Sequence, residues 1–165
     1  VDDNLRTNIE NIWAIGDVNG GPQFTYISLD DFRIIRDQIF GGNYTSVKRR
    51  RTVASSVFIT PPFAHIGLRE KEAIQKGYRI KIAKLSAASI PRARILNKTQ
   101  GILKSVIDAD TGEILGCTLF CTESSEMINT IQVAINAGLD YRTIRDTIFT
   151  HPSMTEAFND LYASV

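Results

Sequence analysis

The chain has 165 residues, about the length of one domain, and 43% of them are hydrophobic and 22% charged. This composition supplies a core and excludes an intrinsically disordered chain, and every apolar run is far shorter than the roughly 18 residues of a membrane span. The net charge of +1 removes the usual electrostatic argument for nucleic-acid binding. Two cysteines are too few for the disulfide framework of a small secreted domain, so we expect a reducing compartment, the cytoplasm.

The charged residues are unevenly distributed, which indicates a domain boundary. Residues 1–47 hold 3 basic and 7 acidic side chains, whereas residues 48–165 hold 16 and 11. The change occurs at Lys48-Arg49-Arg50-Arg51, where we place the boundary. Four adjacent cations could bind phosphate, but a solvated linker or a strand edge is the simpler interpretation at this small net charge.

The first 47 residues predict a strand, a turn and a helix. Ile12-Trp13-Ala14-Ile15 is a short apolar run that ends at Gly16-Asp17, which predicts a buried strand stopped by a turn. Apolar residues recur at near-helical spacing over 24–40, and Gly41-Gly42 ends the helix that they predict. These elements are too few to bury a core alone.

The remaining residues predict strands followed by helices. We expect strands at 52–59, 78–85, 102–108 and 114–121, and helices at 70–76, 124–137, 140–149 and after Pro152. Residues 109–113 contain Asp and Gly where a hairpin must turn back. Strands joined by hairpins and followed by helices indicate an α+β fold, with a mainly antiparallel sheet flanked by helices.

His151 and Glu156 form the strongest local signal for chemistry. A carboxylate that accepts one imidazole N–H selects the tautomer and raises the basicity of the other nitrogen, which makes a general acid/base pair. A structural interpretation remains open beside it, because Ser153-x-x-Glu156 is also the pattern of a capping box at a helix start.

Gly16-Asp17 is a second candidate site. A carboxylate at the end of a strand, after a glycine that permits close approach, could bond the hydroxyls of a cofactor, although such turns are common without any ligand. The chain contains no G-x-G-x-x-G turn, so most of any dinucleotide site would lie elsewhere.

The cysteines and histidines indicate neither a disulfide nor a metal site. Cys117 and Cys121 lie four residues apart on one predicted strand, a span of roughly 13 Å, whereas a disulfide needs Cα atoms within about 7 Å. We therefore expect both cysteines to be small buried side chains. His65 and His151 stand apart from any cluster with metal-ligand spacing, so no metal is expected.

Four motifs, taken together, carry a resemblance to a known family. Thr7 and Trp13-Ala14-Ile15-Gly16-Asp17 resemble the second flavin-contacting segment of the flavoprotein disulfide reductases, the class I pyridine nucleotide-disulfide oxidoreductases. Residues 60–73 look like the T-x-P-x-x-A-x-V-G-L-T-E-x-E-A stretch of that family, with one position fewer between Pro62 and Ala64, and residues 101–104 with 114–116 resemble its hairpin. His151-Pro152-Ser153-Met154-Thr155-Glu156 is similar to its His-Pro-Thr-x-x-Glu signature. The four occur in the family's order.

The resemblance implies that the chain contains segments of two domains with different functions. Residues 1–47 would be the C-terminal segment of an FAD-binding domain, with Gly16 and Asp17 at the flavin's ribityl or phosphate portion. Phe24 and Thr25 would approach the isoalloxazine ring. Residues 51–165 would be the dimerisation, or interface, domain of a homodimer.

The resemblance also implies the chemistry of the pair. His151 would exchange protons with thiols in the partner subunit's active site, and Glu156 would orient it. The family's redox-active Cys-x-x-x-x-Cys and its NAD(P)H domain belong upstream, and Val1-Asp2-Asp3-Asn4 has no initiator methionine. We therefore expect the chain to begin inside a longer FAD-dependent enzyme and to be inactive alone. The alternative is a free-standing α+β binding module that uses Lys48–Arg51 for an acidic partner or nucleic acid.

Overall fold

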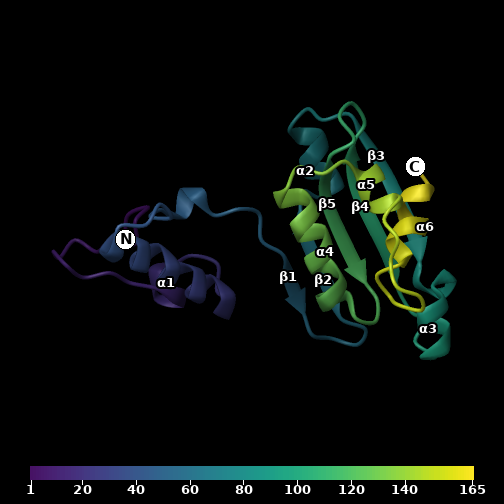
Figure 1. Cartoon of the computed structure of the whole chain (residues 1–165), viewed down its shortest axis with the longest axis horizontal. Helices are drawn as coiled ribbons and strands as arrows, with labels where there is room; N and C mark the ends of the chain where they lie inside the picture. The colour runs from purple at the N-terminus through teal and green to yellow at the C-terminus, as the bar shows by residue number, and fades with distance from the viewer. The chain divides into compact units, whose positions relative to one another are not determined.

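The computed structural model describes residues 1–165, which form two compact units, Val1–Arg51 and Thr52–Val165 (Figure 1). The division falls at the end of the basic cluster Lys48–Arg51. None of the helices in either unit combines the length and hydropathy that a membrane crossing needs.

The first unit contains one long helix and two short 3-10 helices. They are η1 (Gly16–Asn19), α1 (Thr25–Phe40) and η2 (Val47–Arg49). The predicted helix over 24–40 is confirmed, and Gly41 ends it in the left-handed region with φ of 80°. Ile27, Asp31 and Ile34 are buried at positions i, i+4 and i+7, so one face of α1 is covered. The buried apolar residues of this unit are few, as the sequence predicts: Leu5, Ile27 and Ile34.

The predicted strand over Ile12–Ile15 is wrong. The segment forms a single antiparallel bridge, between Arg6 and Trp13, and Ile12 and Ile15 are 52% and 40% exposed. A strand needs a neighbour along its length, and within this unit only residues 5–7 lie beside the segment, through hydrogen bonds such as Ala14 N–H to the Leu5 carbonyl (3.1 Å).

The second unit is built on a five-stranded antiparallel sheet. Its strands in spatial order are β1 (Ser55–Val57), β2 (Phe63–Gly67), β5 (Ile114–Phe120), β4 (Ile102–Asp108) and β3 (Ile80–Ser86). Every neighbouring pair is antiparallel, which confirms the predicted α+β class. The central pair, β4 and β5, is the predicted hairpin, with Lys104 opposite Thr118.

Helices complete the second unit. They are α2 (Glu70–Gln75), η3 (Ala87–Ser89), α3 (Pro91–Ile95), α4 (Ser124–Asn136), α5 (Tyr141–Arg145) and α6 (Ala157–Ala163). The predicted helices at 70–76 and 124–137 are confirmed, whereas the one at 140–149 ends early, at Arg145. The sequence analysis missed β2 and α3 and made β1 too long. β2 was missed because Pro61-Pro62 signals an end, while the strand starts again at Phe63.

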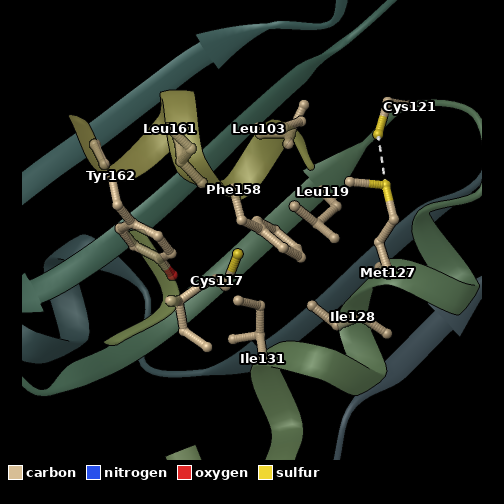
Figure 2. Packing of buried hydrophobic residues seen from close by; sticks show 14 of the residues in the cluster. Leu103, Cys117, Leu119, Cys121, Met127, Ile128, Ile131, Phe158, Leu161 and Tyr162 are labelled. Atoms are coloured by element: carbon tan, nitrogen blue, oxygen red, sulfur yellow. Dashed lines mark hydrogen bonds between the residues drawn. The ribbon is translucent and has the colours of Figure 1, made fainter. Parts of the chain in front are cut away.

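The core lies where α4 and α6 pack on one face of the sheet (Figures 1 and 2). Alternate residues of β4 and β5 point into this layer, in keeping with the two-residue period of a strand. Fully buried contributors include Leu103, Cys117 and Leu119 from the sheet, Met127, Ile128 and Ile131 from α4, and Phe158, Leu161 and Tyr162 from α6. The sheet therefore holds α6 firmly, and the segment before α6 carries His151.

His65 of β2 is half-buried and predicts a pH dependence of stability. Its Nε2 lies 3.0 Å from the Gly67 carbonyl, and its Nδ1 lies 2.8 Å from the hydroxyl of Thr118. Because a carbonyl only accepts, Nε2 carries the proton and Nδ1 accepts from the hydroxyl. Burial lowers the pKa of His65 below the 6.5 of a free imidazole, since removal from water disfavours the charged ring.

We expect the free energy of unfolding to fall as the pH drops below 6.5, because the unfolded chain then binds a proton on His65 more readily than the folded chain. Urea denaturation at several pH values between 8 and 5.5 measures this slope. A His65→Gln variant should have a shallower slope over the same range. Identical slopes in the two proteins would contradict the assignment.

Candidate functional site

His151 lies in the connection between α5 and α6 in the second unit. Asp140 caps α5 by accepting the N–H of Arg142 at 2.7 Å. Phe149 packs against the core before His151, and Met154 is buried in it after His151. These two contacts hold the connection against the unit, while the His151 side chain itself is 67% exposed.

Glu156 binds the imidazole of His151. Its Oε2 lies 2.7 Å from Nδ1 of His151. Because a carboxylate only accepts, Nδ1 carries the proton and Nε2 is left with its lone pair. Nε2 forms no hydrogen bond within the chain, and the side chain that carries it is 67% exposed.

The other carboxylate oxygen of Glu156 accepts a hydrogen bond from the backbone. Its Oε1 accepts the N–H of Ser153 at 3.1 Å, and the hydroxyl of Ser153 accepts the N–H of Glu156 at 3.2 Å. This reciprocal pair is a capping box at the turn that leads into α6. The two interpretations of Glu156 from the sequence therefore coexist, one on each carboxylate oxygen, and the glutamate is held in place by the turn that it caps.

Gly16 and Asp17 form the second candidate site, at the start of η1 in the first unit. Gly16 is buried with φ of 70°, and a Cβ there would lie 3.0 Å from the hydroxyl of Ser28, so the backbone runs close against α1. The side chain of Asp17 is exposed, and its carbonyl accepts the N–H of Gly20 at 3.2 Å. The turn thus presents a carboxylate to solvent while its backbone rests on α1.

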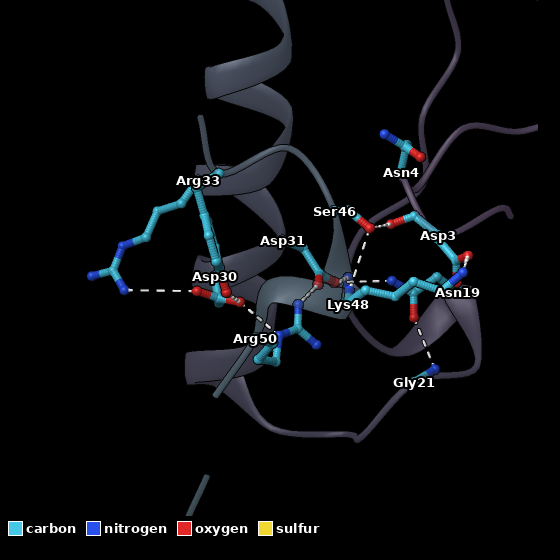
Figure 3. Close-up of polar contacts among 12 residues, drawn as sticks. Asp3, Asn4, Asn19, Gly21, Asp30, Asp31, Arg33, Ser46, Lys48 and Arg50 are labelled. Atoms are coloured by element: carbon cyan, nitrogen blue, oxygen red, sulfur yellow. Dashed lines mark hydrogen bonds and ion pairs between the residues drawn. The ribbon is translucent and has the colours of Figure 1, made fainter. Parts of the chain in front are cut away.

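Asp31 binds the turn of Gly16–Asn19 through its buried carboxylate (Figure 3). The sequence analysis missed this residue. Its Oδ2 accepts the N–H of Gly16 and the amide of Asn19, both at 2.9 Å, and its Oδ1 pairs with Arg50. The carboxylate is 1% exposed. A signal was present, because an aspartate between Ile27 and Ile34 interrupts the apolar stripe of α1 and must find partners if buried.

Replacing Asp31 with Ala should lower the free energy of unfolding of the first unit by about 1–3 kcal/mol, because the Gly16 N–H loses its charged acceptor. Trp13, the only tryptophan, lies in this unit, so its fluorescence during urea denaturation measures the change. Asp30→Ala is the matched control, since Asp30 contacts Arg50 (2.6 Å) and accepts the Tyr44 hydroxyl (3.0 Å) but does not contact Gly16. A larger loss for the control than for Asp31→Ala would contradict the role given to Asp31.

Phe24 and Thr25 stand at the N-terminus of α1. Phe24 occupies the N-cap position and offers no side-chain acceptor, so the first N–H groups of the helix lack a cap of this kind. The Phe24 and Tyr26 rings stack in parallel, with centroids 5.1 Å apart and planes at 7°. The side chains of Phe24 and Thr25 are exposed. No hydrogen bond joins either of these residues to Asp17.

Three residues of the basic cluster, Lys48, Arg49 and Arg50, have partners within the first unit, and Figure 3 shows those of Lys48 and Arg50. Lys48 pairs with Asp3, Arg50 pairs with Asp30 and Asp31, and Arg49 donates to the Asn43 carbonyl. The acidic excess of residues 1–47 thus neutralises cations that follow it in sequence. This pairing disfavours the alternative in which the cluster is an open site for an acidic partner or nucleic acid.

Cys117 and Cys121 are free and buried, which confirms the expectation of small core side chains. Burial raises the pKa of both thiols, that of Cys121 to about 12, and Cys121 Sγ lies 3.9 Å from the Met127 sulfur (Figure 2). Both thiols are therefore protonated at neutral pH and are poor nucleophiles. No group of three or more His, Cys, Asp or Glu side chains is arranged to hold a metal ion.

Comparison with known proteins assigns the second unit to a family. Residues 53–162 match the dimerisation domain of the pyridine nucleotide-disulphide oxidoreductases. The chain therefore belongs to this family, and the antiparallel sheet with its flanking helices is the dimerisation domain of a flavoprotein disulfide reductase.

Individual relatives extend the match to the first unit. Over all 165 residues the chain is 50% identical to "Probable pyridine nucleotide-disulfide oxidoreductase RclA" of Escherichia coli, and it spans 37% of that protein. The solved structure of RclA, titled an HOCl-induced flavoprotein disulfide reductase, matches 100% of the chain with a TM-score of 0.97 and is covered to 38%. A dihydrolipoyl dehydrogenase of Zymomonas mobilis is 32% identical over 155 residues, which are 94% of the chain and 33% of that enzyme. The chain thus spans less than two-fifths of the length of these relatives.

Proposed function

We propose that this chain is the C-terminal part of an FAD-dependent NAD(P)H disulfide oxidoreductase that works as a homodimer in the cytoplasm. Residues 51–165 are its dimerisation domain, and residues 1–47 are the last segment of its FAD-binding domain. The observation that carries the proposal is the His151–Glu156 pair, at 2.7 Å, in a chain that belongs to this family. The NAD(P)H site and the redox-active cysteines lie outside this chain.

Apolar side chains of the first unit support its place in a larger domain. Large hydrophobic residues on η1 and α1 are exposed although α1 already buries one face: Val18, Leu29, Phe32, Ile39 and Phe40. A helix that is apolar on more than one face is normally covered on more than one side. The remainder of an FAD-binding domain would supply that cover, so the unit alone is not expected to retain FAD.

The residues of the first unit fit FAD in chemical terms. Gly16 brings the backbone close, and Asp17 presents a carboxylate that can accept hydrogen bonds from ribityl hydroxyls. Phe24 and Thr25 stand at an uncapped helix start, where the helix dipole favours negative charge. Bound FAD would carry electrons from NAD(P)H to the disulfide. Asp31 would keep the turn of Gly16 and Asp17 in place.

His151 handles protons in the proposed reaction. Its Nε2 takes a proton from a thiol of the partner subunit as that thiol becomes a thiolate, and returns a proton when a thiol product leaves. Glu156 holds Nδ1–H and stabilises the positive charge that the ring then carries. Because the thiols are in the other subunit, each active site needs two chains, and this chain alone has no oxidoreductase activity.

Mixing two inactive full-length variants tests this proposal. One variant carries His151→Ala, and the other carries Cys→Ser at both redox-active cysteines upstream of this chain. If His151 acts across the interface, a mixed dimer has one complete active site, and disulfide reduction returns to about a quarter of the wild-type rate after equal mixing, since about half of the dimers are mixed.

No recovery in demonstrated mixed dimers would contradict action across the interface, because it is the result expected when His151 serves its own subunit. Differently tagged subunits, copurified on both tags, show that mixed dimers have formed.

A further inference from the structure

Little of the His151 side chain packs against the unit, so the backbone of its segment must set its position. The imidazole is 67% exposed, and its one hydrogen bond within the chain is the contact with Glu156. Glu156 lies at the start of α6, whereas His151 follows from the end of α5. The capping box with Ser153 holds the Glu156 carboxylate, whereas the position of the His151 backbone also depends on how the segment leaves α5.

Asn159, on the first turn of α6, reaches across to the end of α5. Its Nδ2 donates to the carbonyls of Arg145 at 2.6 Å and Thr147 at 2.9 Å, with a longer contact to Ile144 at 3.3 Å. The last carbonyls of a helix have no partner within the helix. The side-chain amide of Asn159 thus donates hydrogen bonds to the carbonyls at the end of α5. The chain continues from there to His151.

The backbone of Asn159 is tied to the other end of the same segment. Its N–H donates to the Glu156 carbonyl at 3.0 Å. Asn159 therefore contacts both the end of α5 through its side chain and the residue that binds His151 through its main chain. This single residue closes the segment 146–156 into a loop with its two ends held together.

We propose that Asn159 is a positioning residue for His151: by holding the end of α5 against α6, it keeps Nδ1 of the imidazole on Glu156 and Nε2 turned outward. The consequence for catalysis rests on the proposed function of His151. Asn159 itself touches no reacting atom.

The chemistry of the contact requires an amide donor. Ala at position 159 would leave the carbonyls of Arg145 and Thr147 to water and free the end of α5 to move. Asp has the same shape as Asn but only acceptors, so it would repel the same carbonyls. Gln keeps the donor on a chain one methylene longer and should restore part of the contact.

Nitrogen-15 NMR of the imidazoles tests the proposal on this chain, which contains only two histidines. In the wild type, we expect His151 to be held as the Nδ1–H tautomer by Glu156. In Asn159→Ala, we expect the two nitrogen shifts of His151 to move toward those of a freely rotating imidazole, and in Asn159→Gln to return part of the way. The signals of His65, on β2, should stay unchanged and show that the fold persists.

Two results would overturn the proposal. One is that His151 keeps its wild-type tautomer and shifts in Asn159→Ala while His65 is also unchanged. If Asn159→Ala fails to fold, the isosteric Asn159→Asp is measured instead, and wild-type His151 signals there would be the second. Asn129→Ala is the matched control, because Asn129 donates to one carbonyl within α4, that of Ser125 at 3.1 Å.

Kinetics of the whole flavoenzyme separate this proposal from the proposed function. We expect Asn159→Ala to lower kcat for disulfide reduction by about tenfold to a hundredfold, with the KM for NAD(P)H unchanged, because a misplaced catalytic group loses rate rather than binding. A changed His151 spectrum together with unchanged kcat would contradict the catalytic role of His151 and leave the positioning by Asn159 standing. An unchanged spectrum with lowered kcat would overturn the positioning alone.

Discussion

Replacing His151 with Ala in the whole flavoenzyme is expected to slow the reduction of its disulfide substrate by about 10²–10⁴-fold, the usual contribution of a positioned acid/base. The loss should fall on the step in which thiols exchange with the substrate. Reduction of the flavin by NAD(P)H should keep its wild-type rate, because His151 has no part in that half-reaction in the proposed mechanism. Stopped-flow absorbance of the flavin, with and without disulfide substrate, measures the two steps separately.

Glu156 and Ser153 provide the matched comparison. Glu156→Gln keeps the size of the side chain but removes the charge that, in the proposed mechanism, balances the positive charge on the His151 ring, so it should lower the same step by a smaller factor. Ser153→Ala removes only the capping hydroxyl, which contacts the Glu156 N–H at 3.2 Å, and should cost about 1 kcal/mol of stability with little change in rate. If His151→Ala slows both half-reactions equally, or neither, the acid/base assignment is wrong.

Replacing Phe158 with Ala should lower the free energy of unfolding of the second unit by about 3–5 kcal/mol, because it removes a fully buried ring and leaves a cavity. Phe158 projects from α6 among Leu103, Leu119 and Ile131, where both helices meet the sheet (Figure 2). Its neighbours cannot collapse into the space without moving strands that are hydrogen-bonded on both sides. Urea denaturation followed by circular dichroism measures the loss.

Val133→Ala is the control for this prediction. Val133 lies on α4 and is 67% exposed, so shortening it creates no cavity, and the change in stability should stay within about 0.5 kcal/mol. Comparable losses in the two variants would show that Phe158 does not occupy the centre of the core.

Glu156 performs two tasks with one carboxylate. One oxygen accepts the Ser153 N–H of the turn into α6, and the other accepts the Nδ1–H of the imidazole. The same side chain would therefore link an ordinary folding requirement to the proposed catalysis. This arrangement explains why the pattern Ser153-x-x-Glu156 is compatible with both interpretations of the sequence.

Local features of the sequence were sufficient to predict several helices and strands and the pairing of His151 with Glu156. The helix at 24–40, the hairpin of β4 and β5, and the pairing of His151 with Glu156 all depend on residues close together in the chain. Periodicity, turn residues and capping patterns report such contacts because a few neighbouring side chains determine them. Four motifs in order were also enough to indicate the family to which the chain belongs.

Only the tertiary structure showed the features that depend on residues distant in the sequence. Ile12–Ile15 has the composition of a strand but finds only one bridging residue, whereas β2 forms after two prolines because β1 and β5 lie on both sides of it. Asp31 and Asn159 gain their roles from carbonyls, amides and cations that lie several to many residues away. The sequence shows which side chains can donate, accept or carry charge. Their partners are determined only by the tertiary structure, because burial and hydrogen bonding depend on which segments pack together.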